Sequence, residues 1–174
     1  MKFADHHLHF IKNLRIEVNL PAGVEVLFPF NKVEVWEINQ LFYQKYYHDN
    51  FPRVMIFGIN PGRLGGGVTG IPFTDPIRLA NFCGIENTLE AKGELSSTFI
   101  YEMISAYGGT EKFYQRFYFT AVSPLGFIKD HKNLNYYDMP NWKSLLEKYI
   151  VQGIQTQLLF GVERHVAFCL GQGI

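Results

Sequence analysis

The stretch "RVMIFGINPGRLGGGVTGIPFTDP", from Arg53 to Pro76, carries the clearest sign of the fold. It begins with a short, continuous apolar run, which is typical of a strand buried in a parallel sheet. The run leads into a glycine-rich loop that also carries one asparagine, Asn60, and one phenylalanine, Phe73. Glycine-rich loops that follow strands often bind phosphate groups, so the first question is whether this loop does so.

The loop lacks what the two common phosphate-binding motifs require. A Walker loop ends in Gly-Lys-Ser/Thr, and no lysine occurs between Arg53 and Pro76. A dinucleotide fingerprint needs G-x-G-x-x-G leading straight into a helix, whereas Pro61 interrupts "GINPGRLGGG". The residues therefore give little support to a nucleotide cofactor.

Asn60 and Phe73 suggest a different chemistry. An amide is a poor proton acceptor, so Asn60 is suited to orienting a water or binding an amide-like edge rather than to acting as a strong base. Phe73, held after Pro72, offers a flat surface for stacking, and glycines let backbone amides approach a ligand closely. These features suit a reaction whose leaving group is a planar heterocycle. A purely structural turn, with Phe73 in the core, accounts for the same residues, and both interpretations stay open at this point.

The chain as a whole alternates strand patterns with helix patterns. We expect strands over residues 53–59, 116–124 and 165–174, and helices over residues 35–49, 75–84, 96–109 and 141–159. Asp75 and Gly84 are the expected caps of the second helix. Ser96 or Ser97 is expected to cap the third helix, and the fourth is expected to break near Gly153. The expected buried stripe of the third helix is Phe99, Ile100, Met103, Ile104 and Tyr107.

This alternation predicts an α/β fold with a parallel sheet in a single domain over residues 1–174, of which residues 1–34 form an irregular N-terminal arm. The working site of such a sheet lies at the carboxyl ends of its strands. The glycine-rich loop and the "AVSPLGF" loop both fall there, so we expect them to meet at one site.

Composition narrows the functional classes. The chain has 174 residues, 47% apolar and 18% charged, as expected for one globular domain with a sizeable core. Its 16 basic and 16 acidic residues give no support for a strongly basic nucleic-acid clamp, although Lys129, His131 and Lys132 form a small local cluster. The N-terminus lacks the apolar core of a signal peptide and no run reaches transmembrane length, so we expect a cytoplasmic protein without a membrane partner.

Metal sites are poorly supported. Cys83 and Cys169 form no C-x-x-C pair, so we expect two buried free thiols rather than a zinc or iron–sulfur site. His7 and His9 in "DHHLH" form an H-x-H pattern, as in some amidohydrolases, but that class needs a full barrel with further ligands. We therefore expect this segment to be solvated, and we expect neither a metal nor an organic cofactor.

Three stretches of the chain resemble one known family. "GINPGRLGGGVTGIPF" resembles the first catalytic motif of the uracil-DNA glycosylase superfamily. It follows, without a gap, the pattern G-M-N-P-G-P-F-G-M-x-Q-T-G-V-P-F of the single-strand-selective monofunctional (SMUG-like) branch, whereas the mismatch-specific branch has a shorter spacer. "SSTFIYEMISAYGGTEKFYQRFYFTAVSPLGF" is similar to a helix and a strand that ends in H-N-x-C-P-L. "QGIQTQLLFGVERHVAFCLGQG" is similar to a later helix and a strand that ends in G-x-G, so the resemblance spans about Arg53 to Gly173.

The resemblance implies a three-layer α/β/α sandwich with a short, mostly parallel central sheet, in a bacterial variant of the SMUG-like branch. It implies a DNA-repair enzyme that flips a damaged base out of DNA and hydrolyses its N-glycosidic bond, with Asn60 positioning the water and Phe73 stacking on the base. The implied base pocket is Gly58, Ile59, Pro61, Gly62, Pro72, Phe73, Ala121 and Ser123. The implied contacts to single- or double-stranded DNA are Arg63, Thr69, Lys129 and Lys132, in a monomer.

Two departures from the family pattern matter. Ala121 occupies the position of the base-reading asparagine, so we expect a broader set of deaminated bases than uracil alone. The family's second catalytic motif, a His-Pro loop after one more strand, has no counterpart before Ile174. We therefore expect the last strand and that motif to be missing from the chain and its activity to be weak or absent. The alternative function is a catalytically incomplete nucleic-acid or nucleobase-binding module of the same fold.

Overall fold

A computed structural model describes residues 1–171 of the chain. Residues 172–174, which the strand predicted over 165–174 included, lie outside the described part. The α-helices are α1 (Phe3–Asn13), α2 (Val33–Tyr46), α3 (Gly66–Thr69), α4 (Pro76–Cys83), α5 (Leu95–Tyr107), α6 (Thr110–Arg116) and α7 (Trp142–Gln157). The strands are β1 (Val24–Leu27), β2 (Arg53–Gly58), β3 (Phe117–Ala121), β4 (Gly126–Lys129), β5 (Lys132–Leu134) and β6 (Val162–Cys169). Three short 3-10 helices are η1 (Pro29–Asn31), η2 (Tyr136–Asp138) and η3 (Leu158–Phe160).

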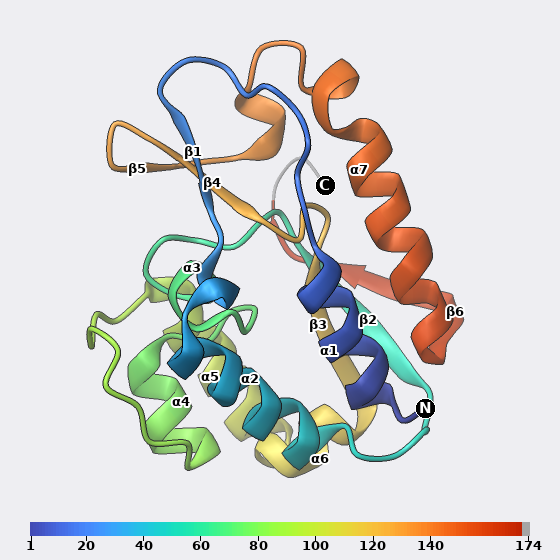
Figure 1. The fold of residues 1–174 in the computed structure, drawn as a ribbon. Helices are drawn as coiled ribbons and strands as arrows, with labels where there is room; N and C mark the ends of the chain where they lie inside the picture. The colour runs from blue at the N-terminus through green and yellow to red at the C-terminus, as the bar shows by residue number, and fades with distance from the viewer. Residues whose placement is uncertain (172–174) are drawn as a thin grey trace.

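The predicted parallel sheet is present, with strand order β3-β2-β6. Met55 of β2 pairs with Tyr118 of β3 and with Ala167 of β6, both in parallel. Helices α4 and α5 lie on one side of these strands and α7 on the other, so the arrangement has the three layers expected for the fold (Figure 1). This confirms the α/β/α prediction.

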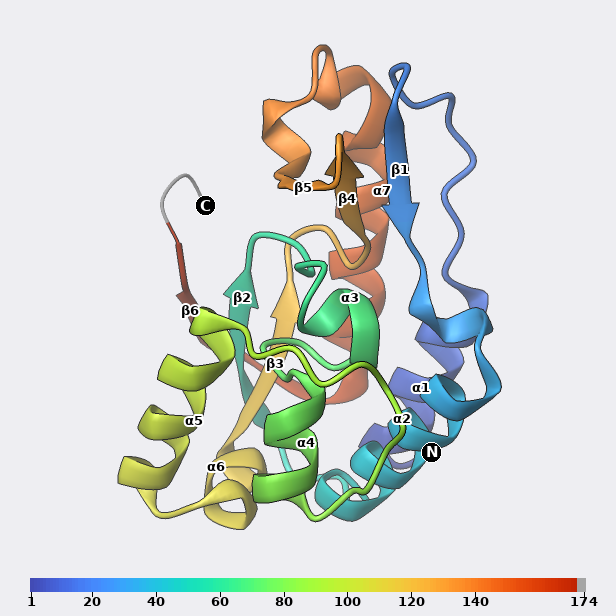
Figure 2. The ribbon, with the colours of Figure 1, turned by 90° about the vertical axis from the view of Figure 1, so that its left-hand side faces the viewer.

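A second sheet was not predicted. It is antiparallel, has strand order β1-β4-β5, and stands above the carboxyl ends of β2 and β3 (Figure 2). Asp130 and His131 connect β4 to β5 with positive φ angles (49° and 59°), a conformation characteristic of a tight two-residue hairpin turn. Asp130-His131 is not the Asn-Gly type of sequence that marks such turns, so the hairpin was not predicted.

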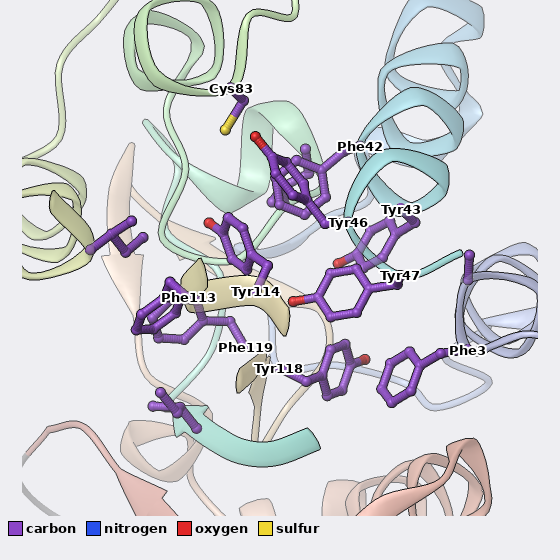
Figure 3. Close-up of a cluster of buried hydrophobic side chains, with 14 of the residues drawn as sticks. Phe3, Phe42, Tyr43, Tyr46, Tyr47, Cys83, Phe113, Tyr114, Tyr118 and Phe119 are labelled. Atoms are coloured by element: carbon purple, nitrogen blue, oxygen red, sulfur yellow. The ribbon is translucent and has the colours of Figure 1, made fainter. Parts of the chain in front are cut away.

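Aromatic side chains fill the space between the parallel sheet and the helices. Phe3, Phe42, Tyr47, Tyr114 and Tyr118 are each at most 2% exposed, and the labelled rings gather around one centre (Figure 3). The hydroxyl of Tyr47 donates to the carbonyl of Phe117 (3.0 Å), so that burial of its ring leaves no unpaired polar atom. The abundance of aromatic residues is therefore mainly a property of the core.

The N-terminal segment differs from the predicted irregular arm. Within residues 1–34, α1 is a regular helix, and Phe3, Ala4, His7 and Ile11 are buried by it. His7 is 4% exposed and stacks on Tyr43 with ring centroids 3.6 Å apart, so the prediction of a solvated "DHHLH" segment is wrong for this residue. Apolar residues at helical spacing were present, but polar neighbours within the segment obscured them.

Several details of the other elements were confirmed. Asp75 caps α4 by accepting from the amide of Arg78 (2.8 Å), and Gly84 ends the helix in the left-handed conformation. The break predicted near Gly153 is absent, because α7 runs continuously through this residue.

Other details were wrong. Phe99 and Tyr107 of α5 are 64% and 44% exposed, because the buried stripe runs through Ser97, Ile100, Tyr101 and Ile104 instead. The residue at the cap position of α5 is Glu94 rather than Ser96 or Ser97.

Strand β6 is an edge strand with mostly exposed residues. Cys83 is buried but Cys169, on β6, is exposed, so only one of the two predicted buried thiols is buried. No group of histidine, cysteine and acidic side chains within residues 1–171 is arranged to hold a metal ion. In the same part of the chain, no helix has both the length and the apolar character needed to cross a membrane.

Candidate active site

The glycine-rich loop after β2 is held in place by its own backbone. The carbonyl of Gly62 accepts hydrogen bonds from the amides of Gly65 (3.3 Å) and Gly67 (2.8 Å), and α3 follows directly. The hydroxyl of Thr69 then donates to the carbonyl of Thr74 (2.6 Å). These bonds fold the loop tightly over the end of the sheet, which the missing side chains of the glycines permit.

Asn60 is oriented by a segment far away in the sequence. Its Nδ2 donates to the carbonyl of Leu134 (3.3 Å), and its Oδ1 accepts from the amide of Tyr136 (3.0 Å). A further contact of 3.5 Å joins Nδ2 to the carbonyl of Pro61. An amide oxygen has two lone pairs, so Oδ1 keeps one with which it can accept from a water or a ligand.

Phe73 is held in a strained backbone conformation beside β2. Its φ is 55°, in the left-handed region that is unusual for a bulky residue. Its ring lies against Phe119 (ring centroids 5.1 Å apart), and a Cβ placed on Gly58 would come within 2.6 Å of its Cζ. Glycine at position 58 therefore makes the room that the ring occupies. Backbone strain of this kind is found where a particular side-chain position is needed.

A cleft with a volume of about 190 Å³ opens at the carboxyl ends of β2 and β3. Among the predicted site residues it is lined by Gly58, Ile59, Asn60, Pro61, Gly62, Pro72, Phe73 and Ala121. Gly58 and Ala121 are register partners across β2 and β3, so the two loops meet as expected. The remaining lining residues are Gly66, Glu94, Ser96, Thr120, Asn133, Asn135 and Leu170.

Two predicted site residues, Ser123 and Thr69, are buried away from the cleft. Ser123 is fully buried and its hydroxyl donates to the carbonyl of Leu125 (2.8 Å), which leaves it unsuited to reading a base. Thr69 is also fully buried, with its hydroxyl bonded inside the loop. A DNA contact by the Thr69 side chain does not fit this position, because a phosphate group cannot reach it.

The cleft has two walls of different origin. We call residues Gly58–Gly62 with Pro72 and Phe73 the loop wall, and Asn133 with Asn135 the hairpin wall. Asn133 connects the hairpin wall to the chain just beyond the loop wall, since its Oδ1 accepts from the amide of Arg63 (2.9 Å), which follows Gly62. Neither Asn133 nor Asn135 was predicted as a site residue, because both lie outside the three stretches that resemble the family.

Glu94 is the acidic side chain of the cleft. Its Oε1 lies too close to Gly62, and its Oε2 too close to Gly65, for a Cβ to fit at either glycine without moving the carboxylate. Its Oε2 also accepts from the hydroxyl of Ser97 (3.2 Å). Glu94 was not predicted as a site residue, because it precedes α5 and only the folded chain brings it against the glycine-rich loop.

A buried polar network lies beneath the cleft. Thr120, which lines the cleft, donates to Oε1 of Gln157 (2.6 Å), and Tyr118 donates to the same oxygen (3.0 Å). Nδ1 of His7 is 2.8 Å from the hydroxyl oxygen of Tyr118. Because Tyr118 donates its single hydroxyl hydrogen to Gln157, His7 is the donor in this pair. Among the described residues, Nε2 of His7 has no hydrogen-bond partner. Burial accordingly lowers the pKa of His7 from 6.5 to about 3, which keeps the ring neutral.

Comparison with known proteins identifies the family. The uracil-DNA glycosylase superfamily model matches residues 44–174. A crystal structure of wild-type SMUG2 from Pedobacter heparinus is similar over 99% of this chain and 77% of that chain, with 44% sequence identity and a TM-score of 0.94. No protein of curated function matches the chain. The chain belongs to the uracil-DNA glycosylase superfamily.

Membership of the uracil-DNA glycosylase superfamily makes this protein a DNA glycosylase, a hydrolase that acts on DNA. The predicted resemblance to a bacterial SMUG-like glycosylase is confirmed, as is the fold. The loop that carries the resemblance is the one that lines the cleft, so family membership and geometry point to the same part of the molecule.

Proposed function

We propose that this glycosylase hydrolyses the N-glycosidic bond of uracil and other deaminated bases in DNA, within the cleft between its two walls. The observation that carries the proposal is the position of Asn60. Its amide is fixed by Leu134 and Tyr136, and it lines the same cleft as the ring of Phe73. An extruded base stacks on Phe73 while Oδ1 of Asn60 orients the attacking water.

The chemistry suits the residues that are present. An amide cannot take a proton as a strong base, but departure of a heterocyclic base from a sugar puts most of the barrier into stabilising developing charge. Fixed donors matter more for such a barrier than proton abstraction does, and an oriented water can attack once the bond has weakened. The orientation of Asn60 by two backbone groups supports this role because the amide needs no rearrangement when the substrate binds.

Exposed cations near the cleft support DNA as the substrate. Arg63 follows the first half of the loop, and its side chain makes no hydrogen bond or ion pair with other residues in the described part of the chain. Lys129 and Lys132 are exposed register partners at the end of the hairpin that carries Asn133. We propose that these three side chains contact phosphates on either side of the extruded nucleotide.

The test is release of base from oligonucleotides that carry uracil, hypoxanthine or xanthine, in single and double strands. The full chain is compared with Asn60→Ala and with Asn81→Ala, a matched change at an exposed asparagine of α4. We expect release by the full chain and by Asn81→Ala, and a loss of at least about 100-fold in Asn60→Ala. If none of the proteins releases a base, the proposed glycosylase activity is contradicted. If Asn60→Ala releases base as fast as the unmutated chain, the proposed role of Asn60 is contradicted.

A second function rests on Ala121, which lines the cleft where the family's base-reading amide is expected. A cleft without that amide suits a nucleobase-binding module that has lost the chemistry. Binding of damaged oligonucleotides without base release would favour this alternative.

A further inference from the structure

The polar residues of the hairpin wall are placed by strand geometry. In extended backbone successive side chains point to opposite faces. Leu134 and Tyr136 pack in the second hydrophobic cluster of the protein, around Phe127 and Leu146. Asn133 and Asn135 alternate with them and both line the cleft. Asn135 continues the extended run with φ −74° and ψ 145°, so its side chain shares the face of Asn133.

The two asparagines differ in how their amides are used. Oδ1 of Asn133 is bonded to the amide of Arg63 and so connects the hairpin wall to the chain just beyond the loop wall. The side chain of Asn135 is half-buried and has no hydrogen-bond partner among the described residues. The polar atoms of this amide are not among the buried unpaired atoms of the described residues, so they are open to the cleft and available to a ligand.

Asn60 fixes where Asn135 lies. Two of the bonds made by the Asn60 amide go to the carbonyl of Leu134 and to the amide of Tyr136, the residues immediately before and after Asn135. The residue that we propose orients the water therefore sets the position of a second amide in the same cleft. Neither bond involves the side chain of Asn135, which remains free to meet a base.

We propose that Asn135 reads the base in this cleft, supplying from the hairpin wall the amide that is missing at Ala121. This inference rests on the proposed function and extends it to the choice of base. Deamination replaces an amino group and a ring acceptor by a carbonyl beside a ring N–H. A side-chain amide complements that edge, with its oxygen accepting from the ring N–H and its nitrogen donating to the carbonyl. The ligand class is therefore bases with an N–H next to a carbonyl, such as uracil and hypoxanthine.

The test measures binding separately from cleavage. Oligonucleotides carry uracil or cytosine on a 2′-fluorinated sugar that blocks cleavage, and the ratio of their affinities is measured for each protein. The proteins are the full chain, Asn135→Ala, Asn135→Asp, the double variant Asn135→Ala/Ala121→Asn, and Asn81→Ala as the matched control.

We expect the full chain and Asn81→Ala to prefer uracil. Asn135→Ala should reduce the preference by about tenfold or more, as loss of a two-point contact to a base does. Asn135→Asp keeps the size of the side chain but loses its donors, and should reduce the preference as well. The double variant should recover part of the preference, because it returns an amide to the cleft. Unfolding midpoints of all variants are measured beside the affinities, so that a folding defect is recognised.

An unchanged preference in a folded Asn135→Ala would overturn the inference, and so would absence of any preference in the full chain. A preference that depends on Asn135 in a protein that releases no base from cleavable substrates would contradict the proposed enzyme but support the base-reading role. The two failures are therefore distinguishable.

Discussion

The loop wall and the hairpin wall border one cleft but are built on different sheets. The loop wall continues the central strand of the parallel sheet, and its shape comes from glycines and from bonds within the loop itself. The hairpin wall begins in the small antiparallel sheet: Asn133 lies in β5, Asn135 follows that strand, and both contribute side-chain amides. Neither wall makes the site alone, because Asn60 of the loop wall is oriented by the backbone groups of Leu134 and Tyr136, on either side of Asn135.

The largest effect is expected where the antiparallel sheet touches the loop wall. Gly126 begins β4, and a Cβ there would collide with the backbone oxygen of Pro61 in the loop wall. Because the backbone cannot move aside as a flexible side chain does, Gly126→Ala should destabilise the fold by about 3 kcal/mol. Urea unfolding of the two proteins gives the difference in the free energy of unfolding, and a change below about 1 kcal/mol would show that β4 does not pack against the loop wall as described.

A smaller effect is expected from a change within the loop wall. A Cβ on Gly58 meets the ring of Phe73, which is half-buried and has room to shift toward the cleft. Gly58→Ala should therefore lower kcat/KM for base release by about 10- to 100-fold, since misplacing a positioning group is costly. The loss of stability should be only about 1 kcal/mol.

A double-mutant cycle identifies the cause of the Gly58→Ala effect. In a Phe73→Ala background, the substitution should add little, because the ring that it displaces is gone. If Gly58→Ala lowers kcat/KM in the Phe73→Ala background as much as in the original protein, displacement of the Phe73 ring is not the cause.

The network beneath both walls predicts a pH dependence of stability. His7 has a pKa of about 3 in the folded protein, below its ordinary 6.5, so the unfolded chain binds the extra proton between these values. Its contribution to stability is complete above pH 6.5 and is lost as the pH falls toward 3. Protonation of His7 should therefore lower the free energy of unfolding by at most about 1.4 kcal/mol per pH unit in this range.

The control for this slope is His7→Asn, whose amide can still donate to Tyr118. It should be less stable at neutral pH but should lose less stability between pH 6.5 and 4.5. Unfolding midpoints measured across this range test the prediction, and identical slopes would exclude His7 as their cause.

The smallest effect is expected behind the sheet, in α7. Gly153 lies inside this helix, and a Cβ there would make only ordinary contacts, 3.7 Å from Cγ of Pro124. Gly153→Ala should stabilise the protein by about 0.5–1 kcal/mol, because glycine is costly in a continuous helix. Gly161→Ala is the matched control: the site is open, but its φ of 91° is unfavourable for alanine, so stability should fall. Thermal unfolding distinguishes the two, and destabilisation by Gly153→Ala would indicate a helix that bends there.

Features that depend on neighbours along the chain were predictable from the amino-acid sequence. The apolar run of β2, the caps of α4 at Asp75 and Gly84, and the loop with Asn60 and Phe73 were all predictable. Each of them follows from local periodicity, turn chemistry or a contiguous motif, and the structure bears out their positions.

Which other side chains contact these features became clear only from the three-dimensional fold. Glu94 and Asn135 enter the cleft, while Ser123 and Thr69 turn away from it, because burial and strand alternation select one face of each segment. The role of α1 was hidden for the same reason: His7 becomes part of the core only when Tyr43 and Tyr118 pack around it. Contacts between segments more than 70 residues apart, such as Asn60 with Leu134 and Tyr136, are formed by the packing of the two sheets and leave no pattern along the chain.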